Sequence, residues 1–489
     1  MKKINNKIVL LLSIMIFSMV TATFFIGAVM ATDLKVSEPK SSQTVSLNII
    51  VTDQQVPGVQ AVVSDFLASP LGENVSSVTV SSSGTTSNDQ YTNIATAMAA
   101  GSNTYDVIGM DVVWTAQFAS SGWIVPLDDR LVPNELDAYV PSLVSTCTYN
   151  GHTYAYPYFM NLGILFYRKD LMDENYGVGM WSESQFSTWE GLNQTANYIL
   201  NNVSGNLVNP NLVGYIGQFD NYEGGVCNFI EMCGSAGATE LVSGTTVNIV
   251  NNAGAIKAMT FFQKLVPPQY TGVQGNRFII PRSALVFDEG SSITLWDQNN
   301  SIFMRQWTFG YPNSLDNNIE FGIVPLPHFT GVSNFKTSCI GGANLAIPTF
   351  ISAQKQHEAF NLIKYLGQTT AQEAELTTVG NFPGLLSVYN TPPTGYEWIA
   401  NWSDQFAETL IRPKEPQYTL ISSVFSNEFS NILSGGKTVS NGLQSMQTNI
   451  EQILAGPPEV GIPGYSVGLT ILAAGSAIGI MIMLRKRRK

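Results

Sequence analysis

Short runs of β-branched residues alternate with amphipathic stretches in the first part of the chain, and this alternation limits the folds that it can adopt. The predicted strands are residues 45–51, 77–81 and 105–109, and the predicted helices between them are residues 59–68 and 91–100. Strands that alternate with helices form parallel sheets covered by those helices. The sequence therefore predicts an α/β protein.

The predicted strands also indicate where a ligand would bind. In open parallel sheets, ligands bind beyond the carboxyl ends of the strands. The residues at these ends are Thr52 and Asp53, the loop 82–87, and Asp111. Asp111 has a second explanation, because Asp is favoured just before a helix, where it caps free N–H groups. Its position alone leaves both roles open.

Apolar segments lie at both ends of the chain and predict its topology. Residues 1–31 have a basic start, a long apolar run and a small-residue cleavage site, which is typical of a secretory signal peptide or, if uncleaved, an N-terminal anchor. Residues 465–484 carry no charge and can span a bilayer as a helix. The basic tail 485–489 should stay in the cytoplasm. We therefore expect a single-pass membrane protein with an extracellular body, flanked by a linker (32–44) and a Pro/Gly stalk (456–464).

The charge of the body excludes one class of function. The formal net charge is −12, and eight of the 24 basic residues lie in the two terminal tails, which leaves 16 basic against 36 acidic residues. A body this acidic does not bind nucleic acid through a basic patch. Only 12% of residues are charged, against about 25% in ordinary domains. One hypothesis for this low content of charged residues is exposure to acid, because protonated carboxylates hydrate poorly. The other is that the charge content of extracellular proteins varies widely.

The cysteines and histidines do not predict a metal site or a cofactor. Neither the four cysteines nor the three histidines have zinc-site spacing. Cys227 and Cys233 are six residues apart, so on one helix they point to different faces and cannot bridge each other. Other disulfides remain open for Cys147 and Cys339, as do buried free thiols.

Nine short segments follow one another in a characteristic order along the chain. They are YDVIGMDVVW (105–114), FA (118–119), GWIVPLD (122–128), GHTYAYP (151–157), GILFYRKDL (163–171), TWEGL (188–192), FMRQW (303–307), GGANLAI (341–347) and RPKEPQY (412–418). This series resembles the extracellular solute-binding protein family that includes bacterial maltose-binding and archaeal trehalose/maltose-binding proteins. The resemblance covers nearly all of residues 45–455, and the order of the segments is more specific than any one of them.

This resemblance implies a two-lobe, periplasmic-binding-protein-like fold with crossing hinge strands. Lobe 1 would comprise residues 45–155 and 325–370, and lobe 2 residues 158–320 and 376–455. The lobes would close on a sugar, which the resemblance leads us to expect to be a di- or oligosaccharide, without catalysis. The partners implied are ABC permease subunits with a cytoplasmic ATPase, and the C-terminal helix would hold the receptor at the membrane beside them.

The resemblance also implies the residues that contact the sugar. Aromatic faces cover the C–H side of a sugar ring, and planar polar groups hydrogen-bond its hydroxyls. Aromatic candidates match family positions at Phe159, Trp307 and Tyr222, although for Tyr222 packing at a helix start is an equal alternative. The polar candidates are Asp53, Asp111, Asn161 and Arg412.

One departure from the family leaves the sugar open. Archaeal disaccharide binders of this family carry a Trp after the Gly-Gly of the crossing strand, whereas this chain has Ala343. A lost stacking face can widen the site or change the sugar. Because the same fold serves several solute classes, a polyol or a short peptide is a further alternative.

Two enzymatic readings compete with a receptor. An anchored glycoside hydrolase needs two positioned carboxylates, for which Asp288 with Glu289, or Glu223 with Glu231, are candidates. Residues 434–438 are similar to a phosphate-binding loop, but Asn431 replaces its first Gly. An ordinary turn between two helices explains that segment.

Overall fold

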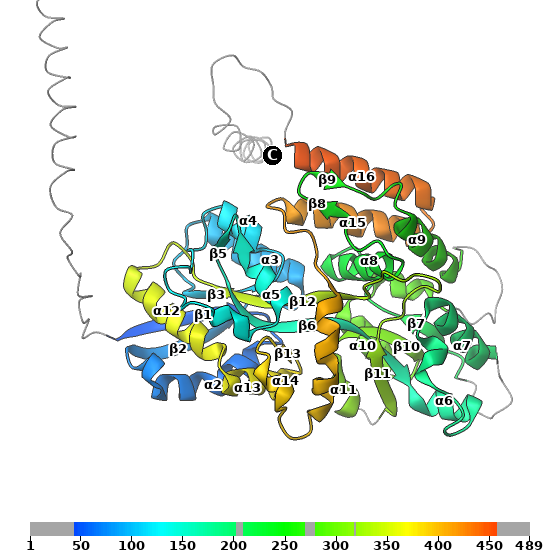
Figure 1. Cartoon of the computed structure of the whole chain (residues 1–489), viewed down its shortest axis with the longest axis horizontal. Coiled ribbons are helices and arrows are strands. Elements are labelled where there is room, and N and C mark those ends of the chain that lie inside the picture. Colours follow the sequence, from blue (N-terminus) through cyan, green and yellow to red (C-terminus); the bar gives the residue numbers. More distant parts are fainter. Residues whose placement is uncertain (1–43, 202–208, 269–278, 317–318, 457–489) are drawn as a thin grey trace, which may run out of the picture. The chain divides into compact units, whose positions relative to one another are not determined.

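The computed structural model describes residues 44–201, 209–268, 279–316 and 319–456 (Figure 1). The predicted signal segment, the predicted membrane helix 465–484, the basic tail and nearly all of both linkers lie outside these residues. Within the described ranges, every helix is either too short or too polar to cross a lipid bilayer.

One large sheet runs through the described part of the chain. Along its main path the strands follow the order β2-β1-β3-β12-β6-β10-β7, with β11 and β13 paired to β6 and β14 paired to β12. Its strands are β1 (Val45–Val51), β2 (Val75–Ser82), β3 (Val107–Asp111), β6 (Tyr156–Arg168), β7 (Val213–Ile216), β10 (Ser301–Trp307), β11 (Phe321–Pro325), β12 (Ser338–Ala346), β13 (Phe382–Pro383) and β14 (Thr409–Leu410). Short hairpins are formed by β4 (Thr148–Tyr149) with β5 (His152–Thr153), and by β8 (Val242–Ser243) with β9 (Thr246–Val247).

Helices cover this sheet and pack on one another (Figure 1). They are α2 (Val56–Ala68), α3 (Ser87–Ala99), α4 (Thr115–Ser120), α5 (Pro141–Val144), α6 (Lys169–Tyr176), α7 (Trp189–Asn201), α8 (Glu223–Ser235), α9 (Ala253–Leu265), α10 (Glu289–Asp297), α11 (Gly310–Asp316), α12 (Ala353–Leu366), α13 (Thr369–Val379), α14 (Ser387–Asn390), α15 (Tyr418–Leu433) and α16 (Val439–Ala455).

The predicted parallel strands are confirmed, with small changes in bounds. β1 pairs in parallel with both β2 and β3. The helix predicted from residue 59 begins at Val56, because Pro57 is tolerated in a first turn, where no N–H partner is needed. The helix predicted from residue 91 begins at Ser87, because the Thr86 side chain accepts a hydrogen bond from the Asp89 amide at 3.1 Å and caps it.

The alternation of side chains along β1 separates two hydrophobic cores. Leu47, Ile49 and Val51 pack with residues of α2, α12 and α13. Ile50, between them in sequence, packs instead in the core that contains Ile94 of α3. Successive side chains of a strand point to opposite faces, so helices cover both faces of the sheet at β1.

Strands β6 and β12 extend through two parts of the sheet. Residues 156–162 of β6 pair with β12, while residues 163–168 pair with β10 and β11. β12 pairs with β3 near its carboxyl end and with β14 at its amino end. The segment predicted to cross between lobes, residues 341–347, therefore lies in β12 and just beyond it. Every residue of β6 is buried.

Helix α8 is buried along its whole length. It packs between α9, α15 and the strand β12 (Figure 1). Helices α15 and α16 are joined by residues 434–438, in which Gly435 has a φ of 78°. A left-handed residue at this position favours glycine, and the turn predicted there is confirmed.

Candidate functional site

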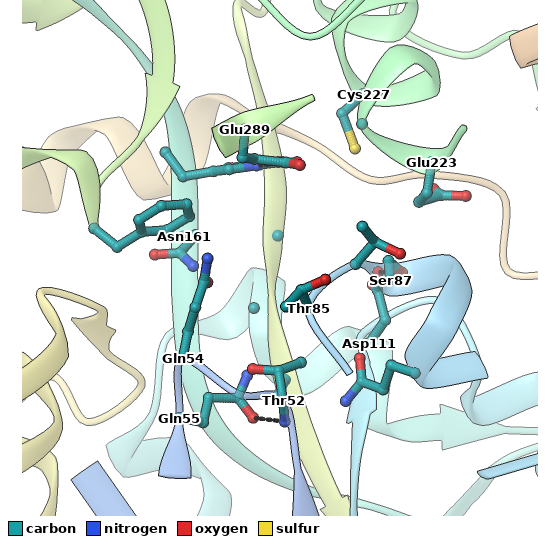
Figure 2. Close-up of a pocket in the computed structure, with 18 of the residues that line it drawn as sticks. Thr52, Gln54, Gln55, Thr85, Ser87, Asp111, Asn161, Glu223, Cys227 and Glu289 are labelled. Atoms are coloured by element: carbon teal, nitrogen blue, oxygen red, sulfur yellow. Dashed lines mark hydrogen bonds between the residues drawn. The ribbon is translucent and has the colours of Figure 1, made fainter. Parts of the chain in front are cut away.

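A cavity of about 120 Å³ lies at the carboxyl ends of β1 and β3, the position predicted for a ligand. The loop before α3, the strands β6 and β12, and the first turns of α8 and α10 complete its wall. Figure 2 shows Thr52 and Gln54 on one side of this space and Cys227 and Glu289 on the other. Its lining residues are Thr52, Gln54, Gln55, Thr85, Thr86, Ser87, Gln90, Asp111, Phe159, Asn161, Glu223, Gly224, Cys227, Glu289, Trp307, Phe309, Gly341, Gly342, Ala343 and Arg412.

Arg412 joins two carboxylates that come from different elements. Its Nη2 lies 2.6 Å from Asp111 at the end of β3, and its Nη1 lies 2.6 Å from Glu223 at the start of α8. Ser87 donates a hydrogen bond of 2.9 Å to Asp111. Asp111 does not cap a helix, because α4 begins four residues later with Trp114 at its N-cap. Its carboxylate is held toward the cavity instead.

Burial and charge compete at this ion pair. Arg412 is only 2% exposed. Burial opposes its positive charge, but Asp111 and the other neighbouring acidic groups keep the pKa of Arg412 above its ordinary value. Burial raises the pKa of Glu223, although Arg412 and the hydroxyls of Ser422 and Tyr418 act in the opposite direction. Among the described residues, the Nε of Arg412 has no hydrogen-bond partner.

Trp307 borders the cavity and is fixed from several sides. The guanidinium of Arg305 lies over its ring, 3.8 Å from the centroid. Its indole N–H donates to Glu289 at 3.2 Å, and Tyr222 donates to the same carboxylate at 2.7 Å. A Cβ at Gly341 would come within 2.9 Å of the indole. The glycine at this position of β12 therefore makes room for the ring.

Asn161 uses its side chain within the protein. Its amide nitrogen donates to Asn381 at 3.0 Å, and its oxygen accepts from Thr308 at 2.5 Å. Asn381 in turn donates to the buried carboxylate of Glu375 at 2.6 Å. Phe159, two residues earlier on β6, pairs with Ala343 of β12. Both β6 residues lie on the cavity wall.

The structure brings five of the seven predicted site residues to one cavity. They are Asp111, Phe159, Asn161, Trp307 and Arg412. The other two, Asp53 and Tyr222, lie beside it. Asp53 is exposed and accepts a hydrogen bond from Ser82, while its neighbours Thr52, Gln54 and Gln55 line the wall. Tyr222 occupies the N-cap position of α8 and is connected to the cavity wall through its bond to Glu289.

Several lining residues were not predicted as ligand contacts. Thr85, Thr86 and Ser87 lie in the loop that sheet topology had indicated. The sequence indicates Glu223 and Glu289 only as candidate hydrolase carboxylates. Gln54 directly follows the first strand, so the strand-end rule could have found it. No local sequence pattern predicts that Phe309 lines the cavity.

The carboxylates proposed for a hydrolase have structural partners. Glu231 forms a two-point ion pair with Arg305, at 2.6 and 2.8 Å, and Glu223 binds Arg412. Asp288 caps α10 by accepting from the Ser291 amide at 2.8 Å. Within the part of the chain that the structure describes, no group of three or more metal-binding side chains occurs. All four cysteines are free and buried. Cys227 and Cys233 lie on the same helix, α8, which is the case in which the two cannot bridge each other.

A sheet with helices on both faces, crossed by two long strands beside a polar and aromatic cavity, defines a binding protein of the two-lobe periplasmic type. The sequence profile described as "bacterial extracellular solute-binding protein" matches residues 62–403. The chain belongs to this family, whose members bind solutes and are not enzymes.

Relatives and solved structures support this assignment. A probable ABC transporter-binding protein of Deinococcus radiodurans is 25% identical over 365 residues, which cover 73% of this chain and 81% of the relative. The maltose-bound MalE3 of T. maritima superposes with a TM-score of 0.72 and 23% identity, over 83% of this chain and 99% of that one. A solute-binding protein of Thermotoga lettingae bound to α-D-tagatose gives a TM-score of 0.69 and 19% identity, over 84% and 100%. At these identities the solved structures establish the shared fold.

Proposed function

We propose that this protein is the membrane-anchored extracellular receptor of an ABC importer, and that it binds a sugar in the cavity at the ends of β1 and β3. The observation that carries the proposal is the joining of Asp111, Trp307 and Arg412 at one cavity of a family member. Asp111 and Arg412 offer charged hydrogen-bonding groups, which suit hydroxyls. Trp307 and Phe159 offer apolar faces, which suit the C–H side of a sugar ring.

Arg412 supports a role in holding the ligand. Its Nε is buried and lacks a partner among the described residues, and an unmade hydrogen bond of this kind is costly. A sugar hydroxyl that accepts from this group would remove the cost. Because Arg305 covers one face of Trp307, a sugar ring would stack on the opposite face or along the edge.

Adjacent cavities support a ligand longer than one ring. A cavity of about 410 Å³ meets the central one at Glu223, and another of about 380 Å³ meets it at Gln54, Glu289 and Phe309. A chain of two or more sugar units would extend from the centre into either space. These shared lining residues favour a di- or oligosaccharide, and the maltose that MalE3 of T. maritima holds is a ligand of that size.

Binding would proceed by closure of the two lobes about hinge strands, near residues 154–158 and 321–326 and after Leu366. Arg412 would help to hold the closed state, because it binds Asp111 of the predicted lobe 1 and Glu223 of the predicted lobe 2. The closed surface would then be recognised by the permease subunits. Anchoring through residues 465–484 would keep the receptor near the permease and raise its effective concentration.

A sugar titration tests the proposal. Tryptophan fluorescence and melting temperature of the full chain would be followed in detergent with glucose, arabinose, trehalose, maltose, maltotriose and cellobiose. We expect a saturable change with one of them, weakened at least about tenfold by Trp307→Phe, since about 1.4 kcal/mol corresponds to a factor of ten. Trp181→Phe is the matched control, because Trp181 packs on Tyr167 and Phe186 outside the cavity.

Titration with other solutes distinguishes a sugar receptor from a receptor for a non-sugar ligand. Two proteins of this fold bind non-sugar ligands: a solute-binding protein of Agrobacterium radiobacter was solved with ribitol, and UgpB of Mycobacterium tuberculosis with glycerophosphocholine. Saturation with ribitol, glycerophosphocholine or a short peptide, and with none of the sugars, would refute the sugar assignment and leave the receptor. A sugar consumed during the titration would refute the receptor.

A further inference from the structure

Cys227 lies on the face of α8 that is turned toward β12. Glu223 precedes it by one helical turn and Glu231 follows it by one turn, so the three side chains share one face. Glu231 accepts a hydrogen bond of 3.1 Å from the backbone amide of Cys339 on β12. The helix face that carries Cys227 is therefore held against the strand at residue 339.

The first turn of α8 is also held against β12, in this case through Arg412. Glu223 binds Arg412 at 2.6 Å, and the Nη2 of Arg412 donates to the carbonyl of Ile340 at 3.4 Å. The sulfur of Cys339 lies 3.7 Å from the same carbonyl. Cys227 therefore lies between two contacts that join α8 to β12. One ends at the amide of Cys339, and the other, through Arg412, ends at the carbonyl of Ile340.

The two thiols interact with each other. The Cys227 thiol donates a hydrogen bond to Cys339, and this bond together with burial raises the pKa of Cys227 well above the ordinary value. Cys227 also lines the ligand cavity, and Figure 2 shows its sulfur directed into that space. Because Cys227 is only 1% exposed, a small reagent reaches this thiol only when the cavity opens.

We propose that Cys227 and Cys339 form a disulfide bond in the exported protein. The thiols lose two protons and two electrons. A small disulfide, or the disulfide of a thiol oxidase, in the oxidising space outside the cell accepts both and becomes two thiols. The family assignment to extracellular proteins supplies that compartment. Because thiolates react and buried thiols stay protonated, the bond should form during folding or while the cavity is open to solvent.

The bond would have a structural effect at the ligand site. It would tie α8, whose first residue is Glu223, to β12, whose Gly341–Ala343 segment lines the cavity. It would also close a loop of about 110 residues, and loops of this length give the larger stabilisations expected of disulfides. The sulfur of Cys227 would turn from the cavity toward β12.

Thiol counting on the full chain tests the bond. The protein would be prepared reduced, and a second sample refolded with reduced and oxidised glutathione; free thiols are then counted in denaturant and the peptides mapped by mass. We expect four thiols in the reduced sample, two after oxidation, and one cross-linked peptide pair that contains residues 227 and 339. The melting temperature of the oxidised form should rise by about 2–5 °C.

Two variants keep the test decisive. Cys147→Ala/Cys233→Ala should lose both remaining thiols on oxidation, whereas Cys339→Ala should keep all three of its own and show no rise in melting temperature. Four free thiols in the oxidised wild type, or a cross-link that involves residue 147 or 233, would overturn the assignment. Because peptide mapping reads the pair in the wild type, the result does not depend on how well a variant folds.

Discussion

Arg305 lies over the indole ring of Trp307 and is itself held by a carboxylate of a different element. The guanidinium is 3.8 Å from the ring centroid, and Glu231 of α8 accepts two of its N–H groups at 2.6 and 2.8 Å. Gln218 accepts a third at 2.9 Å. The orientation of the aromatic wall of the cavity therefore depends on an ion pair whose two residues do not line the cavity.

Arg305→Gln should destabilise the protein strongly. Both partners of the ion pair are at most 2% exposed, and removal of one leaves Glu231 buried without its countercharge, at a cost of about 3–5 kcal/mol. Unfolding in urea, followed by circular dichroism, measures the loss. Arg305→Gln/Glu231→Gln should regain part of it, because no buried charge is then left unpaired.

The control for this experiment is the exposed pair His152–Asp128, whose side chains are 63% and 41% exposed. Exposed pairs contribute about 0–1 kcal/mol, so His152→Gln should change the free energy of unfolding little. Equal losses for Arg305→Gln and His152→Gln would contradict the structural role given to Arg305.

Glu375 should make the protein less stable as pH rises. It is fully buried beside Tyr158 and Asn381, which donate to it at 2.9 and 2.6 Å, and burial raises its pKa from 4.5 to about 7. Between these two values the folded state binds more protons than the unfolded state, so stability falls as pH increases. The shift corresponds to about 3 kcal/mol, fully present below pH 4.5 and lost above pH 7.

Glu375→Gln tests this titration. The variant keeps a polar group for Tyr158 and Asn381 but cannot ionise. Its free energy of unfolding, relative to that of the wild type, should therefore increase as the pH rises from 4 to 8. Glu373→Gln, two residues earlier on α13, should follow the wild type at both values. If the wild type and Glu375→Gln keep a constant difference across this range, the buried carboxylate is not the titrating group. Such a pH dependence would agree with the hypothesis of an acidic habitat.

The sequence predicted the elements of this fold better than it predicted the contacts at the site. β1 has the predicted bounds, because a β-branched run between polar residues is a local signal. The starts of α2 and α3 were placed too late, since Pro57 and the Thr86 cap extend them. The strand predicted at 105–109 is observed at Val107–Asp111, which makes Asp111 a strand end and removes the capping alternative.

Contacts between distant segments could not be derived from the sequence. Asn161 was expected to bind hydroxyls, but its amide group bonds Asn381 and Thr308, partners that only the crossing of β6 brings near. The resemblance placed Arg412 and Asp111 in one cleft, but it did not reveal that they pair with each other across 301 residues. Local sequence patterns cannot predict which polar groups at the cavity already hydrogen-bond to other residues of the protein.

Ligand-induced closure of the predicted lobes can be measured by distance. Val132 and Leu420 are both 57% exposed and lie in the predicted lobes 1 and 2. With Val132→Cys/Leu420→Cys labelled by fluorophores, energy transfer should change on saturation with the sugar identified above, because the two lobes rotate about the hinge strands. The pair Met180→Cys/Leu420→Cys, within lobe 2, should not respond. A response in neither pair would refute closure.

Ala343→Trp should block the central cavity. Ala343 is 2% exposed, lies opposite Phe159 in the pairing of β12 with β6, and lines the wall. An indole at this position would occupy space in a cavity of about 120 Å³, so the sugar should bind at least about tenfold more weakly, a loss of 1.4 kcal/mol or more. Ala343→Ser, which adds one small atom, is the control and should bind almost normally. Tighter binding by Ala343→Trp would instead mean that the cavity opens wide enough to use a second stacking face, as the archaeal disaccharide binders of the family do.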